Sequence, residues 1–349
     1  MTPARALQSA RLRVPRGAPL EAPRVLPCGG LDEGECASLA RAFLGAIDGC
    51  ARNAALFDGL SALERAHLQR RTAQHVRLLF DGDADEAALA DAARAIARAH
   101  ALCGVRLPQL VAAYAVLRAT LEPALRRLAP DDAGRAALGA VLDSRLAHEV
   151  QLQAEVFERI DDDAAQALRR LDAAADAATS RAELGRDAVH AFGSLDGCLA
   201  ALFLVAADDG DLRVEAAFGQ AARPYQQAMD DGRVPRISAD PRRPGGQGIA
   251  ARAWRSGEIV CADAWSGESA LEPWQSLGTQ LGFRSSAAVS LRDGRGGTLA
   301  LLCVYSTWPG FFSTPRVMRL LRHAQRRHGA ALRALRAKAR ARGGVDPAA

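Results

Sequence analysis

The sequence lacks the continuous apolar run of roughly 18 residues that a membrane-spanning helix requires. Aromatic residues make up only 5% of the chain, and Lys338 is its only lysine. The seven cysteines form no Cys-x-x-Cys pair, and their odd number is typical of reduced thiols in a cytoplasmic protein. The seven histidines show no metal-ligand spacing, so we do not expect a zinc site. Because the apolar run is missing, we expect no interaction with membranes either.

Motifs of common catalytic sites are also missing. The chain has no Gly-x-Ser-x-Gly elbow, no kinase signature set and no His-Glu-x-x-His. The glycines at 245, 246 and 248 are not followed by Gly-Lys-Ser/Thr, so they do not indicate a phosphate-binding loop. We therefore expect a protein that is not an enzyme.

The net charge of +5 is unevenly distributed. Residues 1–30 carry a net charge of +4, residues 313–349 carry +9, and the segment between them carries −8. An acidic body between basic ends does not favour nucleic-acid binding. Residues 1–30 contain several prolines and no apolar core segment, which predicts a disordered basic arm and no secretory signal.

Residues 31–150 have helical periodicity throughout, which predicts an all-α region. One predicted helical face contains Leu68, Thr72, His75, Val76 and Leu79. A second contains Ile96, His100, Cys103 and Leu107, with Gly104 placed to end the helix and Pro108 to open the next. A third contains Val111, Tyr114, Leu117 and Leu121, before a bend or end at Pro123.

Residues 151–180 continue a stripe that alternates spacings of three and four. Its members are Val150, Gln153, Phe157, Ile160, Ala164, Ala167, Leu171, Ala174 and Ala178. This pattern predicts a coiled-coil-like signalling helix that pairs two copies of the chain. An amphipathic helix packed on its own domain has the same pattern, so both interpretations stay open.

The period changes to that of strands after Gly193, which predicts an α+β domain with an antiparallel sheet over residues 181–335. The expected strands are Leu199–Val205, Leu212–Phe218, Glu258–Ala262, Ser285–Leu291 and Thr298–Tyr305. The expected helices are Ile249–Arg255, Glu272–Leu281 and a long final helix that begins at Ser313-Thr314-Pro315.

The helical half resembles the sensor globin domain of globin-coupled sensors. The resemblance rests on Glu64-Arg65, on His75 to Phe80, on the run from Ala97 to Val105 that contains His100, and on Leu110 to Tyr114. It implies a globin-like domain over residues 31–150 that binds haem b, with His100 as the proximal ligand of the iron. The pocket residues that it implies are Phe43, Leu44, Thr72, His75, Ile96, Cys103, Leu107 and Tyr114.

The distal side departs from this family. Many members have a tyrosine in an early helix that donates a hydrogen bond to bound oxygen, and the matching position here is Leu44. Without that donor, we expect the haem to bind oxygen weakly. Carbon monoxide or nitric oxide is then favoured over oxygen as the ligand.

The second half resembles a GAF domain, a sensory or dimerisation module. The resemblance rests on Gly246 to Ala250, Gly257 to Asp263, Leu281 to Ser286 and Trp308 to Phe312. It implies a small-molecule pocket, which Trp254, Trp265, Trp274 and Phe283 would line unless they simply fill the core. Residues 336–349 would then form a basic tail.

Together these resemblances imply a multidomain haem-based sensor of O₂, CO or NO without its own catalytic domain. We expect a homodimer through the globin and linker helices and a downstream signalling protein as partner. The alternatives are a haem-free dimeric regulatory scaffold and the sensory part of a diguanylate cyclase or phosphodiesterase system.

Overall fold

The computed structural model describes residues 30–50, 57, 60 and 62–341. The predicted disordered arm lies outside these residues except for Gly30, and the predicted basic tail is described only as far as Ala341. The chain divides into two compact units. The first contains the residues up to Ala92 together with Val111–Gln151, and the second contains Ala93–Leu110 together with Leu152–Ala349.

The first unit is entirely helical in its described part, as predicted. Its elements come from α1 (Glu33–Asp48), α3 (Ala62–Leu79), α4 (Glu86–Leu102), α5 (Leu107–Leu128) and α6 (Asp132–Ala177). A capping box starts α1, because Asp32 accepts from the Glu35 backbone while the Glu35 side chain accepts from the Asp32 backbone. Helix α3 packs against α1, and Arg127 at the end of α5 forms an ion pair with Glu35.

The second unit is built on a five-stranded antiparallel sheet, with the strand order β2-β1-β5-β4-β3. The strands are β1 (Cys198–Ala206), β2 (Leu212–Phe218), β3 (Ile259–Ala262), β4 (Ser285–Arg292) and β5 (Thr298–Ser306). Both faces of the sheet are covered, so β1, β4 and β5 are buried along nearly their whole length and their burial does not alternate. The predicted strands are confirmed to within one residue at most ends.

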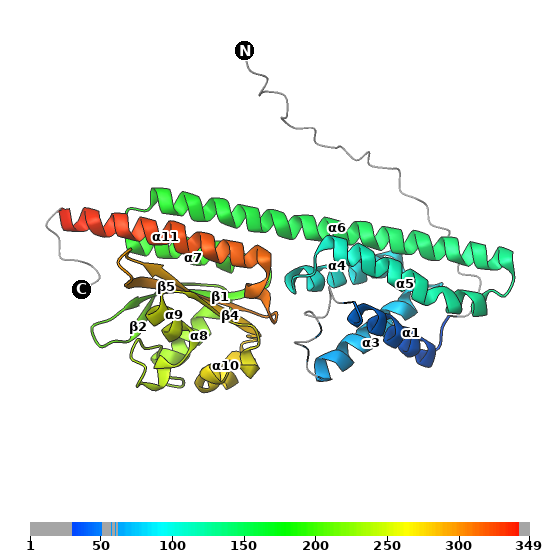
Figure 1. Ribbon diagram of the computed structural model, residues 1–349, viewed down its shortest axis with the longest axis horizontal. Helices are drawn as coiled ribbons and strands as arrows, with labels where there is room; N and C mark the ends of the chain where they lie inside the picture. Colours follow the sequence, from blue (N-terminus) through cyan, green and yellow to red (C-terminus); the bar gives the residue numbers. More distant parts are fainter. Residues whose placement is uncertain (1–29, 51–56, 58–59, 61, 342–349) are drawn as a thin grey trace, which may run out of the picture. The chain divides into compact units, whose positions relative to one another are not determined.

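Helices pack on both faces of this sheet (Figure 1). One face carries α7 (Arg181–Gly193) and α11 (Pro315–Ala341), and the other carries α8 (Ala222–Asp230) and α9 (Ile249–Ser256). Short elements complete the unit: η1 (Pro244–Gly246), η2 (Trp265–Gly267), η3 (Ser269–Trp274), α10 (Gln275–Gln280) and η4 (Phe311–Ser313).

Helix α6 is continuous over 46 residues and buries most of the predicted seam within the chain. Within the second unit, the seam residues Gln153, Phe157, Ile160, Ala164, Ala167, Leu171 and Ala174 are all buried. For this stretch the structure therefore shows the second interpretation, an amphipathic helix packed on its own domain.

One predicted helix is wrong in its first part, and of the two outcomes predicted at Pro123, a bend or an end, the end does not occur. The helix expected over Glu272–Leu281 is a 3₁₀ segment followed by the six residues of α10. Pro273 lies inside this 3₁₀ segment, where it lacks a backbone N–H to donate. Pro123 does not end α5, which continues to Leu128. Among the described residues, no helix combines the length and the apolar character that crossing a membrane demands.

Candidate functional site

His100 lies in the last turn of α4, and the way this helix ends fixes its position. Gly104 has a φ of 86°, a left-handed conformation that favours glycine. The Gly104 N–H donates to the Ala101 carbonyl, and the Val105 N–H donates to the His100 carbonyl at 2.9 Å. These two bonds form a Schellman motif, so the predicted glycine stop after His100 is confirmed.

The His100 imidazole is neutral at physiological pH. Burial lowers its pKa to about 4, and a side-chain hydrogen bond with Gln153 opposes this shift only in part. Its Nδ1 atom is buried and has no hydrogen-bond partner in the part of the chain that the structure describes. A neutral imidazole with one unoccupied nitrogen has the chemistry of a haem axial ligand.

The end of α4 is attached to the sheet-containing domain by a charged contact. The Arg98 guanidinium binds the Asp196 carboxylate through two nitrogens, with Nε–Oδ2 at 2.8 Å and Nη2–Oδ1 at 2.5 Å. Arg98 also lies over the ring of Trp308, 5.6 Å from its centroid. Asp196 precedes β1 and Trp308 follows β5, so one side chain of α4 connects to both central strands.

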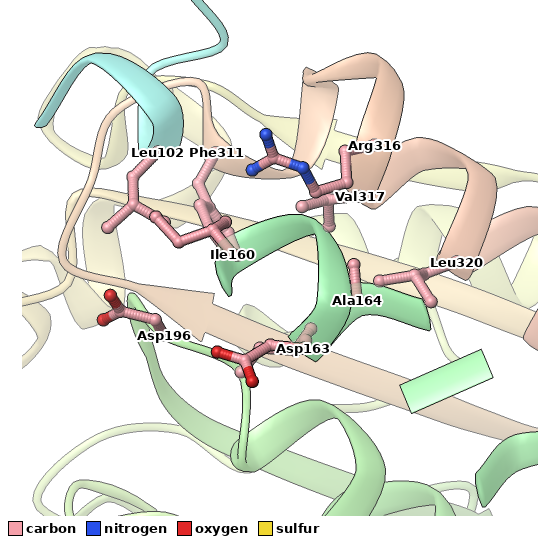
Figure 2. A pocket seen from close by; sticks show the side chains of 10 residues that line it. Leu102, Ile160, Asp163, Ala164, Asp196, Phe311, Arg316, Val317 and Leu320 are labelled. Carbon is pink, nitrogen blue, oxygen red and sulfur yellow. The ribbon is translucent and has the colours of Figure 1, made fainter. Parts of the chain in front are cut away.

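A second attachment comes from the start of α11. The Arg316 Nε donates to Asp161 of α6 at 2.6 Å, and its Nη1 donates to the Ala101 carbonyl of α4 at 3.4 Å. Figure 2 shows Arg316 beside a cavity of about 10 Å³ between the ends of these elements, with Leu102 and Ile160 among its lining residues. The helix that carries His100 is thus packed directly on the domain that follows.

We expect Asp196→Asn to loosen α4 locally without unfolding the protein. The variant loses a bidentate, partly buried charge pair, which is worth about 1 kcal/mol. Amide hydrogen exchange in residues 93–102 should then accelerate about fivefold. Asp162→Asn is the matched control, because Asp162 is exposed and forms no ion pair with a described residue. Equal exchange rates in the two variants would contradict this role of Asp196.

A polar cluster lies inside the first unit. Glu149 of α6 is 2% exposed, and its Oε2 accepts from the Tyr114 hydroxyl at 2.8 Å. The same oxygen lies 3.0 Å from Nε2 of His75. Burial raises the pKa of Glu149 to about 7, although the Tyr114 hydrogen bond and the charge of Arg145 both lower it. Two predicted pocket residues, His75 and Tyr114, are therefore brought together by a carboxylate that the sequence analysis did not single out.

The other predicted pocket residues of the first unit are placed on two helices. Phe43 and Leu44 are half-buried on α1. Thr72 is half-buried on α3, where its hydroxyl donates to the Leu68 carbonyl at 2.9 Å. That hydroxyl bonds its own helix, a common arrangement for threonine within helices.

The predicted face of Ile96, His100, Cys103 and Leu107 is only half correct. Ile96 and His100 lie on α4, one turn apart, and both are half-buried. Cys103 is exposed in the turn after the helix, and Leu107 opens α5. The reason is the glycine stop, because the left-handed Gly104 breaks the helical period before Leu107.

Arg98 and Glu149 are not among the residues predicted from the sequence. Arg98 and Asp196 are 98 residues apart, and no local pattern connects them. Glu149 does have a local signal, because it continues the buried stripe of Leu142 and Leu146 at helical spacing. A carboxylate on an apolar stripe predicts a buried polar contact.

The predicted aromatic pocket of the second domain is almost closed. Trp265 and Trp274 line a cavity of about 20 Å³ with Tyr225 and Tyr305, which is room for roughly one water molecule. Phe283 stacks on Tyr305 in the core beside this cavity. Trp254 is partly buried and packs against the same core. Both interpretations of these aromatic residues therefore hold in part.

No group of three or more His, Cys, Asp or Glu side chains in the described residues has the geometry of a metal site. A haem iron needs only one protein ligand of this kind, so this finding does not bear on His100.

Comparisons with known proteins identify the second domain. Residues 178–332 match the GAF domain family, so this part of the chain is a GAF domain with a five-stranded antiparallel sheet, preceded by a helical region. GAF domains are sensory and regulatory modules of signalling proteins, and the predicted GAF domain is confirmed. No curated protein matches the chain.

Several solved GAF structures resemble the chain. The GAF domain of A. aeolicus nlh2 is 11% identical with a TM-score of 0.37, and the match covers 52% of this chain and 99% of that one. A GAF domain of a phosphoenolpyruvate-protein phosphotransferase from Coxiella burnetii is 16% identical with a TM-score of 0.39, covering 52% and 98%. A free methionine-R-sulfoxide reductase from Neisseria meningitidis is 15% identical with a TM-score of 0.36, covering 49% and 91%.

Proposed function

We propose that this chain is a cytoplasmic haem-based gas sensor in which His100 holds the iron and α4 transmits its state to the GAF domain. The observation that carries the proposal is the neutral His100 imidazole, whose buried Nδ1 has no hydrogen-bond partner among the described residues, on the part of α4 that belongs to the same compact unit as the GAF domain. The resemblance of residues 31–150 to sensor globins supports the choice of haem as the group.

The residues of α4 fit this role. A proximal ligand must be unprotonated to bind iron, and burial keeps His100 in that form. Gln153 contacts the imidazole by a hydrogen bond and would restrain the ring, as outer partners of metal-bound histidines do. Haem, when bound, supplies the iron to which a diatomic gas binds. The absence of a tyrosine at Leu44 favours carbon monoxide or nitric oxide over oxygen in this proposal.

The route to the GAF domain is short. A shift of the last turn of α4 acts on Asp196 and Trp308 through Arg98, and on Arg316 through the Ala101 carbonyl. These residues flank β1, β5 and the start of α11. A small displacement at His100 would therefore reach the sheet and the C-terminal helix without an intervening loop.

The test is the absorption spectrum of the purified protein after expression with added haem. We expect a Soret band that His100→Ala abolishes and His67→Ala leaves unchanged, because His67 is exposed on α3 and forms no hydrogen bond or ion pair with a residue that the structure describes. In His100→Gly, added imidazole should restore the band, which separates loss of a ligand from loss of the fold. An unchanged band in His100→Ala would contradict the assignment.

A haem-free regulatory scaffold is the second candidate function. The observation that favours it is the His75–Glu149–Tyr114 cluster, in which three predicted or buried polar side chains of the first unit contact one another through Glu149 Oε2. A protein that stays colourless with added haem would support this candidate. In either case a downstream signalling protein would receive the output, and we propose no catalytic role for the chain.

A further inference from the structure

A buried pair of an acid and a histidine joins two helices of the first unit. Glu149 of α6 is 2% exposed, and its Oε2 lies 3.0 Å from Nε2 of His75 on α3. The Tyr114 hydroxyl of α5 donates to the same oxygen at 2.8 Å. The other oxygen, Oε1, is buried and has no hydrogen-bond partner among the residues that the structure describes. One oxygen of one carboxyl group thus connects three helices.

This geometry favours a pair that holds one proton. An ionised carboxylate can accept about four hydrogen bonds, and here only Oε2 has a described partner. While one proton resides on either Glu149 or His75, the net charge of the pair is zero. When that proton leaves, the pair carries a net negative charge in an interior that solvates charge poorly. Loss of the proton is therefore unfavourable as long as the helices stay packed.

Arg145 attaches α3 to α6 at a second point. It lies one turn before Glu149 on α6, and its Nη1 donates to the carbonyl oxygens of Leu79 at 2.7 Å and Asp81 at 2.9 Å. Its charge and the Tyr114 hydrogen bond both lower the pKa of Glu149. Burial outweighs them and raises this pKa to about 7, so Arg145 does not replace the proton.

The two attachments lie close together on α3. His75 and Leu79, at the end of the helix, are one turn apart, and both face α6 through these contacts. On another side, α3 packs against α1. If the contact at His75 loosens while Arg145 still binds the Leu79 carbonyl, the response begins in the middle of α3. It can pass from there to α1 without unfolding the unit.

We propose that the His75–Glu149 pair is a proton-binding switch that holds α3 against α6 while it carries its proton and loosens this contact when the proton leaves. The ligand is the proton itself, which stabilises the packed form by mass action as the pH falls. The other charged or titratable groups that face the carboxyl group are Tyr114 of α5 and Arg145 of α6.

The direction of the switch follows from the raised pKa of Glu149. Its value is about 7 in the packed form, against an ordinary value of 4.5 for an exposed glutamate. The packed form is therefore fully favoured below pH 4.5, and this contribution is lost as the pH rises towards 7. Acid tightens the contact between α3 and α6, and neutral or alkaline conditions loosen it. The switch requires no haem, so its failure would leave the assignment of His100 untouched.

The experiment compares amide hydrogen exchange in the full wild-type chain and in Glu149→Gln at pH 5 and pH 8, without added haem. The intrinsic exchange rate rises with pH equally in both proteins, so the ratio of their rates isolates the switch. In residues 72–79 of α3 we expect this ratio to rise about 70-fold between the two pH values. Strand β1 of the second unit is the internal reference, and its ratio should stay constant.

Two further variants separate a switch from a merely structural contact. Glu86→Gln is the matched control, because Glu86 is exposed on α4 in the same unit and should leave the exchange of α3 unchanged. Tyr114→Phe removes a hydrogen bond that lowers the pKa of Glu149, so the exchange of α3 should keep rising to a higher pH before it levels off. Circular dichroism checks that each variant is folded.

Two results would overturn the proposal. One is a ratio in α3 that is the same at pH 5 and pH 8, or that changes equally in β1. The other is a folded Tyr114→Phe protein whose exchange levels off at the same pH as in the wild type. A ratio that rises in α3 alone, together with the upward shift in Tyr114→Phe, is the result that supports the switch.

Discussion

Gly245→Ala should destabilise the GAF domain by at least about 4 kcal/mol, enough to unfold it under most conditions. Gly245 is buried in η1, and a Cβ atom added there would lie 1.7 Å from the Arg236 carbonyl oxygen. That oxygen belongs to the backbone and cannot rotate away as a flexible side chain could. The neighbouring Gly246 has the same constraint, with Asp240 O at 1.8 Å from an added Cβ.

Urea denaturation followed by circular dichroism measures this effect, with Gly267→Ala as the control. Gly267 is exposed in the same domain, and its added Cβ would meet only Ala264 at 3.6 Å, an ordinary contact. We expect the control to change the free energy of unfolding by less than about 0.5 kcal/mol. A Gly245→Ala protein as stable as the control would contradict this prediction. It would show that the backbone at residue 245 can move away from the Arg236 carbonyl at little cost in free energy.

Glu149→Gln should remove a pH dependence of stability worth about 3 kcal/mol. The pKa of Glu149 is about 7 in the folded protein, against an ordinary value of 4.5. A carboxyl group with a raised pKa favours folding when protonated, so its contribution is lost as pH rises from about 4.5 to about 7. The groups that face it are His75, Tyr114 and Arg145, and none of them offsets burial fully.

The measurement is the free energy of unfolding in urea at pH 5 and pH 8. At pH 5 the wild type and Glu149→Gln should be nearly equal, since Gln can accept the Tyr114 hydrogen bond in place of the protonated acid. At pH 8 the variant should be the more stable protein. Other groups, such as His100, titrate in both proteins and cancel in the difference. Parallel pH profiles, as expected for the exposed Glu155→Gln control, would contradict a buried acid at this position.

Local signals made the GAF half predictable. The hairpin of β1 and β2 has its turn at Asp208 to Asp211, and the apolar runs of β4 and β5 are bounded by Gly294 and neighbouring turn residues. Each signal acts within about ten residues, so periodicity and turn chemistry identify the strands. The stop of α4 at Gly104 was predictable for the same reason.

The connections between distant segments were not predictable. Whether the seam of α6 packs on its own domain or on another copy depends on α11, which follows more than 130 residues later. The pairing of Arg98 with Asp196 likewise depends on the tertiary fold. A heptad pattern states that a face will be buried, but not what buries it. The globin-like identity of the helical half stays a prediction, because the observed helices alone do not distinguish it from other all-α folds.

The most direct test of the central claim is hydrogen–deuterium exchange of the haem-loaded protein with and without carbon monoxide. We predict altered protection in two segments, residues 195–199 before and within β1 and residues 308–317 at the start of α11, which contact Arg98 and the end of α4. Arg98→Ala should retain the Soret band and lose this response. Ligand binding that leaves both segments unchanged would contradict the claim that α4 carries the signal from His100 to the GAF domain.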